Sequence, residues 1–266
     1  SYDIYMTGSD QVWNPTYIGF DTNYLLDFAP PSSKKVSYAA SFAISDIPNP
    51  FNFIYSSKLK EYNHISVREN AGRNLIKRMT ERDAEVVCDP TLLLNKEEWG
   101  NIAKRSIFQT SKQYLLVYIV GYAYNPYPQI YNYIKRVNDK LNLPIILINT
   151  KIGPLKGKYK VINVPNIGPN EFLYLIQNAS FIITDSFHGT AFALNFNRRF
   201  ISCVKSKNGG DSRIIDLLKN VGAEKRAMAY DKHDEIPYDN LTNDNTLLLE
   251  LYRDKSIRYL NDILVN

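Results

Sequence analysis

Short apolar runs alternate along the chain with longer stretches in which apolar residues recur every three or four positions. The clearest run, residues 114–120 (YLLVYIV), is almost entirely apolar and is typical of a strand buried on both faces of a sheet. The stretch after it places its apolar residues on one helical face: Ile130, Ile134, Val137 and Leu141. Repeated alternation of this kind predicts an α/β fold.

The same pattern predicts elements in both halves of the chain, whose 266 residues suffice for two α/β domains. Strands are expected at residues 4–6, 36–40, 64–67, 85–88, 114–120, 144–148, 159–164, 181–183 and 200–204. Helices are expected at residues 53–62, 71–79, 97–103, 130–141, 169–179, 190–194, 211–220 and 247–264. Because residues 106–112 are polar and unpatterned, we divide the chain into an N-terminal domain at 1–108, a C-terminal domain at 109–244 and a terminal helix at 245–266.

A corner between a strand and a helix occupies residues 180–192 (SFIITDSFHGTAF). An apolar run ends there in small polar residues, and Gly189 allows a tight entry into the helix expected at 190–194. Open α/β sheets bind ligands at such corners, because helix N-termini present free N–H groups. His188 either serves such a site or packs against the turn, and Asp185 either serves it or caps the helix.

Two more strand ends carry polar residues. Gly8, Ser9 and Asp10 follow the first strand, where glycine permits close backbone approach; the two polar side chains either hydrogen-bond sugar hydroxyls or cap a helix. Arg68 follows the strand at 64–67, and its planar guanidinium matches carboxylate or phosphate oxygens. The alternative for Arg68 is a salt bridge to Glu69 or another nearby acid.

Composition narrows the function classes. A hydrophobic content of 44% and a charged content of 22% are typical of a soluble globular protein. The net charge of +5 suits a small polyanionic substrate, whereas no block of like charges or RNA-binding motif points to nucleic acid. Cys88 and Cys203 are expected to be reduced, buried thiols, and no CxxC or His-rich spacing predicts a metal site. We find no apolar run of about 18 residues and no signal peptide.

Five short blocks together resemble the polysaccharide pyruvyl transferase family. They are GSDQVWN at 8–14, SYAASF at 37–42, ISVRE at 65–69, CDPTLL at 88–93 and TDSFHGT at 184–190, and they occur in the order of the family. The resemblance implies two Rossmann-like domains facing a cleft, as in GT-B glycosyltransferases. It also implies transfer of pyruvate from phosphoenolpyruvate to a pair of sugar hydroxyls as a ketal, in surface or exopolysaccharide biosynthesis.

Further expectations follow from the resemblance. Members of the family usually begin with an additional strand–helix segment, so the first domain is expected to lack its N-terminal part, and the helix at 245–266 is expected to pack back on that domain. The implied partners are phosphoenolpyruvate, as co-substrate, and a saccharide or lipid-linked saccharide acceptor. The implied enzyme is cytoplasmic, needs no cofactor or metal and associates with a membrane only peripherally, through the acceptor.

The resemblance also implies roles for the residues at the strand ends. Arg68 matches the arginine that holds the donor, and His188 holds the phosphate or carries a proton. Asp185 acts as base for a sugar hydroxyl or orients His188. The remaining candidates are Ser186, Gly189, Lys205 and Arg213 for the donor and Gly8, Ser9 and Asp10 for the acceptor.

The lysine of the donor site is the least defined of these candidates. In some members it lies about twenty residues after the histidine, and here that position is Asn208, so Lys205 is chosen by its place after a strand, with Lys207 as the alternative. Two other functions fit the sequence. One is a GT-B glycosyltransferase that uses a nucleotide sugar, and the other is a noncatalytic carbohydrate-binding protein.

Overall fold

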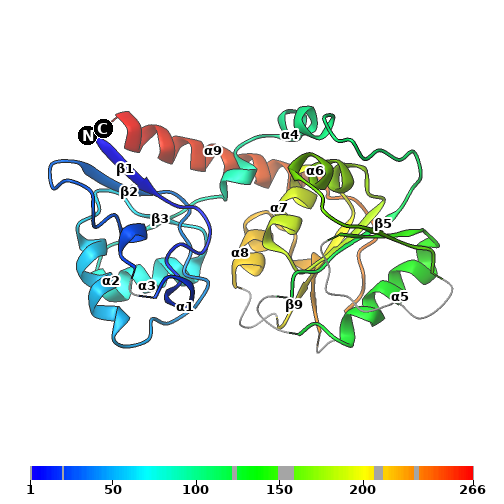
Figure 1. Cartoon of the computed structure of the whole chain (residues 1–266), viewed down its shortest axis with the longest axis horizontal. Helices are drawn as coiled ribbons and strands as arrows, with labels where there is room; N and C mark the ends of the chain where they lie inside the picture. The colour runs from blue at the N-terminus through cyan, green and yellow to red at the C-terminus, as the bar shows by residue number, and fades with distance from the viewer. Residues whose placement is uncertain are drawn as a thin grey trace. The chain divides into compact units, whose positions relative to one another are not determined.

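The computed structural model describes residues 2–19, 21–121, 125–148, 159–206, 212–230 and 234–265. The chain forms two compact units. Unit 1 comprises Ser1–Leu93 and Glu250–Asn266, and unit 2 comprises Leu94–Leu249. Every strand pair in both units is parallel, which confirms the α/β class predicted from the sequence (Figure 1).

The described residues of unit 1 form four short parallel strands. They are β1 (Ile4–Thr7), β2 (Lys34–Ser37), β3 (Ser66–Val67) and β4 (Glu85–Val86). β1 pairs with β2 and β3 with β4, and isolated bridges from Val36 to His64 and from Ala40 to Val67 join the two pairs. β2 ends at Ser37 rather than at the predicted residue 40, because Ala39 takes a positive φ of 51° that interrupts the extended chain.

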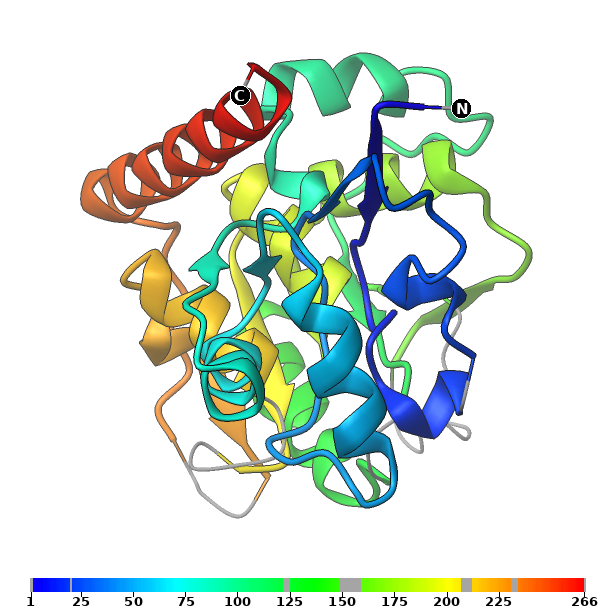
Figure 2. The ribbon, with the colours of Figure 1, turned by 90° about the vertical axis from the view of Figure 1, so that its left-hand side faces the viewer.

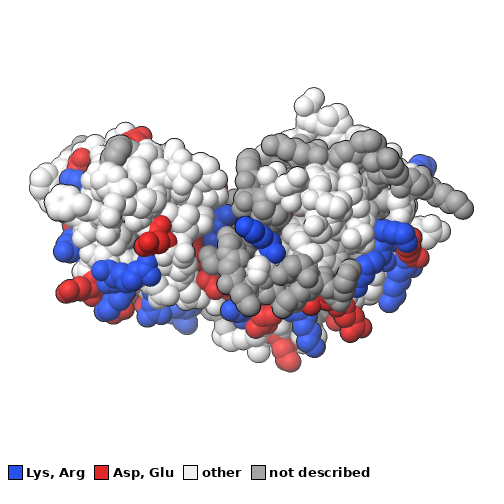
Figure 3. All heavy atoms as spheres, turned by 90° about the horizontal axis from the view of Figure 1, so that it is seen from below, with Lys and Arg blue, Asp and Glu red and all other residues white. Residues whose placement is uncertain are grey.

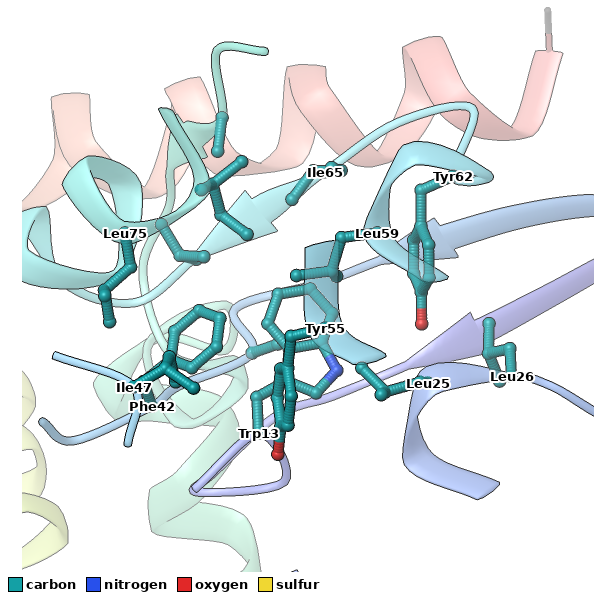
Figure 4. Packing of buried hydrophobic residues seen from close by; sticks show 14 of the residues in the cluster. Trp13, Leu25, Leu26, Phe42, Ile47, Tyr55, Leu59, Tyr62, Ile65 and Leu75 are labelled. Atoms are coloured by element: carbon teal, nitrogen blue, oxygen red, sulfur yellow. The ribbon is translucent and has the colours of Figure 1, made fainter. Parts of the chain in front are cut away.

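One face of this sheet is covered by helices from the N-terminal part of the chain. They are α1 (Pro15–Ile18), η1 (Asn23–Leu25), α2 (Phe51–Lys60) and α3 (Asn70–Thr80), of which α2 and α3 lie side by side (Figure 2). The short helix η2 (Pro90–Leu92) follows β4. The core beneath them centres on the indole of Trp13, whose ring lies 5.3 Å from that of Phe42 and 5.8 Å from that of Tyr62 (Figure 4). Such aromatic contacts stabilise a core beyond the area that they bury.

The other face of the unit 1 sheet is covered by the last part of α9 (Asn243–Val265), which runs on the side opposite this core (Figure 4). The Tyr252 hydroxyl donates to the Val87 carbonyl at 2.9 Å, and the Tyr259 hydroxyl donates to the Ser37 carbonyl at 3.0 Å. The Ser256 hydroxyl accepts from the Cys88 N–H at 2.8 Å. The C-terminal residues from Glu250 onward therefore complete unit 1.

Unit 2 is built on a six-stranded parallel sheet in the order β10-β9-β8-β5-β6-β7. The strands are β5 (Leu115–Tyr118), β6 (Ile145–Ile148), β7 (Val161–Val164), β8 (Phe181–Thr184), β9 (Phe200–Val204) and β10 (Ala227–Ala229). The chain starts at the centre with β5, fills one side, returns to the centre with β8 and then fills the other side. This is the strand order of a Rossmann fold, and its switch point lies between β5 and β8. The sequence did not predict β10, because three residues are too short for a pattern.

Helices cover both faces of the unit 2 sheet (Figure 1). They are α4 (Lys96–Ala103), α5 (Gln129–Leu141), α6 (Pro169–Asn178), α7 (Phe187–Asn195), α8 (Ser212–Asn220) and η3 (Glu224–Arg226), together with the start of α9. α4 packs against α6, and the Trp99 ring meets the Phe192 ring edge-on at 5.1 Å. The division between the units therefore falls at Leu93, before α4, whereas the sequence pattern placed it near residue 108.

The surface of the described residues is mixed in charge. On the face shown in Figure 3, acidic side chains lie among the basic ones. Cys88 and Cys203 are buried free thiols, as the sequence predicted, and burial raises the pKa of both. Among the residues that the structure describes, no helix combines the length and apolar composition needed to cross a membrane.

Candidate functional site

The switch point of unit 2 brings the carboxyl ends of β5 and β8 together. Asp185 directly follows β8, and its two carboxylate oxygens accept hydrogen bonds from the N–H groups of Val120, at 2.6 Å, and Gly121, at 2.9 Å. Asp185 therefore ties the loop after β8 to the loop after β5. This geometry favours a positioning role over that of a free base, because both oxygens already serve backbone donors.

The N-terminus of α7 begins immediately after Asp185. The Ser186 hydroxyl accepts from the Gly189 N–H at 3.2 Å as the N-cap, and the Ser186 N–H donates to Thr184 Oγ1 at 3.0 Å. Because Ser186 supplies this cap, the helix starts at Phe187, three residues before the predicted start at residue 190. His188 is thus the second residue of α7, half-buried at the positive end of the helix dipole.

Gly189 has a different role from the one that the sequence suggested. A Cβ atom at this position would lie 2.5 Å from Thr184 Oγ1 and 3.1 Å from Cδ1 of Tyr118. Glycine is therefore required for the first turn of α7 to pack closely against β8 and β5, rather than for a tight turn into the helix. In Rossmann folds a glycine of this kind permits close packing of a helix on a strand.

The other unit 2 candidates lie on neighbouring elements of the same sheet edge. Lys205 is exposed and directly follows β9, the strand next to β8. Arg213 is half-buried in the first turn of α8. Lys207, the alternative to Lys205 as the donor lysine, and Asn208, the position that the family spacing gives, lie outside the described residues. Of these candidates, Lys205 shares with His188 the carboxyl edge of the sheet, because all the strands are parallel.

Unit 1 buries the guanidinium of Arg68 between two carboxylates. Nη1 donates to Asp89 Oδ2 at 2.7 Å and Nη2 donates to Asp10 Oδ1 at 3.0 Å, and the side chain is only 1% exposed. Burial by itself would lower the pKa of Arg68, but the charges of Asp89, Glu69 and Asp10 outweigh it and raise the pKa. The structure thus shows the salt bridge that the sequence left as an alternative, with Asp89 and Asp10 as the two hydrogen-bonded partners.

Asp89 is a residue to which the sequence analysis assigned no role. Its Oδ2 lies 3.0 Å from the Ser9 hydroxyl, and its Oδ1 accepts from the N–H of Thr91 at 3.0 Å. The sequence signal that could have identified Asp89 is its position at the end of a strand, directly before Pro90. Ser9, Asp10, Arg68 and Asp89 thus form one group, which we call the Arg68 cluster.

Gly8 supports the Arg68 cluster through its backbone. Its φ is +120°, and a Cβ atom there would lie 2.0 Å from the carbonyl oxygen of Tyr38. No other residue fits this position without moving the chain, so Gly8 acts through close backbone approach, as the sequence suggested. The Arg68 cluster belongs to unit 1 and the His188 corner to unit 2, and their use in one site remains a prediction.

Two parallel α/β units, the second with Rossmann strand order, define a GT-B-like protein. A sequence profile of the polysaccharide pyruvyl transferase family matches residues 1–207. The chain therefore belongs to the polysaccharide pyruvyl transferase family, and the resemblance seen in the five blocks is confirmed. A search among proteins of curated function finds no sequence match.

The fold of this chain matches that of a solved structure at low sequence identity. The chain is similar to the UDP-GlcNAc 2-epimerase from Methanocaldococcus jannaschii, with a TM-score of 0.55 and 15% identity, over 94% of this chain and 68% of that one. For a second structure of that enzyme, in complex with UDP-GlcNAc and UDP, the TM-score is 0.49 and the sequence identity is 14%. The match covers 97% of this chain and 75% of that one. For a glycosyltransferase from Rickettsia africae the TM-score is 0.43 and the sequence identity is 12%, over 96% of this chain and 72% of that one. At such identities the likeness concerns the fold alone.

Proposed function

We propose that this protein transfers pyruvate from phosphoenolpyruvate to two hydroxyls of a sugar, forming a ketal. Its family is one of polysaccharide-modifying transferases, which gives the reaction class. The observation that carries the finer proposal is the position of His188. It lies in the first turn of α7 at the switch point between β5 and β8, where Rossmann folds bind anionic ligands.

The reaction needs groups of the kind found at this corner. A proton is added to the methylene carbon of phosphoenolpyruvate, which becomes the methyl group, and a sugar hydroxyl attacks the adjacent carbon. The carbon–oxygen bond to phosphate breaks, and a second hydroxyl closes the ketal. Of the two hydroxyl protons, one balances the proton taken up by the methylene and the other leaves with phosphate. Histidine suits such transfer near neutral pH, and we assign His188 to the proton or to the leaving phosphate.

The two carboxylates around Arg68 differ in a way that supports a donor-binding role. The Asp89 side chain is 2% exposed, whereas that of Asp10 is 58% exposed. We infer that Asp89 holds the guanidinium in place, and that the donor's carboxylate or phosphate exchanges with the accessible Asp10. The exchange replaces one charge-assisted hydrogen bond with another and leaves no buried charge unpaired.

The remaining assignments extend the same proposal. Lys205 and Arg213 add positive charge for the donor, and Ser186 and Gly189 contribute the helix N-terminus. Ser9 and Asp10 serve the acceptor, a saccharide or lipid-linked saccharide. We infer a cytoplasmic reaction, because phosphoenolpyruvate is a metabolite of that compartment, and the scheme draws only on the chain's own groups.

Titration with phosphoenolpyruvate, UDP, GDP and a glycan tests the proposal. Phosphoenolpyruvate is expected to bind in isothermal titration calorimetry, whereas UDP and GDP are not. Binding of UDP or GDP without phosphoenolpyruvate would instead identify a glycosyltransferase with a nucleotide-sugar donor. Binding of a glycan but of none of the other three ligands, unchanged in the His188→Ala variant, would identify a carbohydrate-binding protein.

Substitution of His188 provides the matched kinetic test. His188→Ala is expected to reduce pyruvyl transfer about 100-fold or more, since general acid–base groups contribute roughly 10²–10⁴-fold. The melting temperature is expected to stay within a few degrees, because the ring is half-buried on a helix that Ser186 caps. His64→Ala in unit 1 is the control. Full activity of the His188 variant would contradict the assignment.

A further inference from the structure

A polar pocket of about 430 Å³ opens at the amino-terminal edge of the unit 2 sheet, away from the His188 corner. Its polar lining consists of Gln113, Asn178, Ser180, Arg198, Arg199 and Asn240. These residues precede β5, β8 and β9 or lie beside them, and His188 follows the opposite end of β8. The pocket is therefore separate from the proposed donor site, because the two lie at opposite edges of the sheet.

The two arginines give this pocket its charge. Arg198 and Arg199 lie in the turn between α7 and β9, where the Arg199 carbonyl accepts from the Ile182 N–H of β8 at 2.9 Å. Arg198 Nε donates to the Phe196 carbonyl and Arg199 Nε to Asn240 Oδ1, each at 3.1 Å. The backbone hydrogen bond fixes the main chain of this turn, and the two side-chain bonds fix the Nε atoms of the arginines. Their positions are therefore set before any ligand arrives.

No carboxylate neutralises these arginines within the described part of the chain. The pocket lining contains no acidic residue, and neither arginine forms an ion pair with a described carboxylate. Partial burial lowers the pKa of Arg198; Tyr114 opposes this shift, and the neighbouring charge of Arg199 adds to it. Two positive charges that line one pocket and interact with each other, without a carboxylate in the lining, favour binding of an anion.

The rest of the lining fits a ligand that also carries hydroxyl groups. Gln113, Asn178 and Asn240 offer amides, and Ser180 offers a hydroxyl, so donors and acceptors surround the arginines. A volume of 430 Å³ is in the range of small-molecule sites, which runs from about 300 to 1,000 Å³. We propose that this pocket is a second binding site of unit 2, for a sugar that carries a phosphate or a carboxylate group.

Titration of four probes in the His188→Ala background tests this proposal and removes the contribution of the donor site. Glucose 1-phosphate and glucuronate represent the two forms of the anion, inorganic phosphate represents the anion alone, and glucose represents the sugar alone. We expect at least one of the two sugar anions to bind, more tightly than glucose and inorganic phosphate, and more weakly as salt is added. The stronger of the two identifies the anionic group. Failure of both to bind would overturn the proposal.

Asn240→Asp is the most specific variant. It places a carboxylate where Asn240 Oδ1 already accepts from Arg199, without a change in side-chain size. The new ion pair is expected to weaken binding of the sugar anion at least tenfold without lowering the melting temperature. The double substitution Arg198→Gln with Arg199→Gln is expected to have the same effect on binding, and Arg105→Gln is the control at an exposed arginine of the same unit. Unchanged affinity in both Asn240→Asp and the double variant would overturn the proposal.

These outcomes are independent of the pyruvyl transfer proposal. If wild-type protein fails to bind phosphoenolpyruvate while the sugar anion still binds, the proposed function fails and the second site stands. If phosphoenolpyruvate binds and neither sugar anion does, the second site fails and the proposed function stands.

Discussion

In unit 1 the candidate cation is neutralised by carboxylates, whereas in unit 2 the candidate histidine is positioned by backbone hydrogen bonds. The Arg68 guanidinium is paired with Asp89 and Asp10. At the other corner, Asp185 binds two backbone N–H groups and Ser186 caps α7, so that His188 stands in the first helical turn. Charge is balanced before ligand arrives in unit 1, while geometry is fixed before ligand arrives in unit 2.

This difference bears on how each group would meet a substrate. A helix N-terminus presents backbone N–H groups that bind an anion directly, and the half-buried imidazole of His188 lies beside them. The buried guanidinium of Arg68 binds an anion only by exchanging one carboxylate partner, and loss of Arg68 leaves the buried Asp89 carboxylate without its cation. The same type of substitution should therefore affect stability in unit 1 and activity in unit 2.

The largest effect on stability is expected for Arg68→Ala. The substitution leaves Asp89 buried without its cation, and breaking a buried pair in this way costs about 3–5 kcal/mol. Urea unfolding measures the loss. Arg73→Ala, at an exposed arginine of α3, is the control and should remain within about 0.5 kcal/mol of wild type. A loss below 1 kcal/mol for Arg68→Ala would remove the contrast between the two units.

Gly189→Ala is expected to have the next largest effect. The added methyl group would meet Thr184 Oγ1 at 2.5 Å, and overpacking of this kind costs about 1–3 kcal/mol. A double-mutant cycle with Thr184→Ala isolates the clash, because removal of Oγ1 should restore part of the lost stability. Strict additivity of the two changes would show that the helix does not depend on this close contact.

Much of the fold was predictable from the sequence because its signals are local. The runs at 181–183 and 200–204 became β8 and β9, and the periodic stretch ending at Leu141 became α5. Elements whose signal is not an apolar pattern were missed. α1, for which the sequence predicted no helix, forms because the Asn14 side chain accepts a hydrogen bond from the Thr16 N–H and Pro15 occupies the first helical position.

The site was predictable in its residues and less so in its contacts. The pattern identified Arg68 and His188 as residues that follow strands, but the partners of Arg68 are Asp10 and Asp89, which lie 58 and 21 positions away. Sequence proximity instead suggested Glu69, which accepts from the Ser41 hydroxyl at 3.0 Å. Such pairings depend on the sheet register, which single-sequence patterns do not determine.

Asp10→Asn should have the smallest effect on stability and the most informative effect on binding. Its carboxylate is 58% exposed, and such ion pairs contribute about 0–1 kcal/mol, so the unfolding free energy is expected to change by less than that. If the donor exchanges with Asp10 at Arg68, removal of the competing charge should lower the Kd for phosphoenolpyruvate. Calorimetric titration measures it, with Asp21→Asn, an exposed loop carboxylate of unit 1, as the control. Weaker binding of phosphoenolpyruvate to the Asp10 variant would show that this carboxylate helps to bind the donor, and that it is not the partner that the donor displaces.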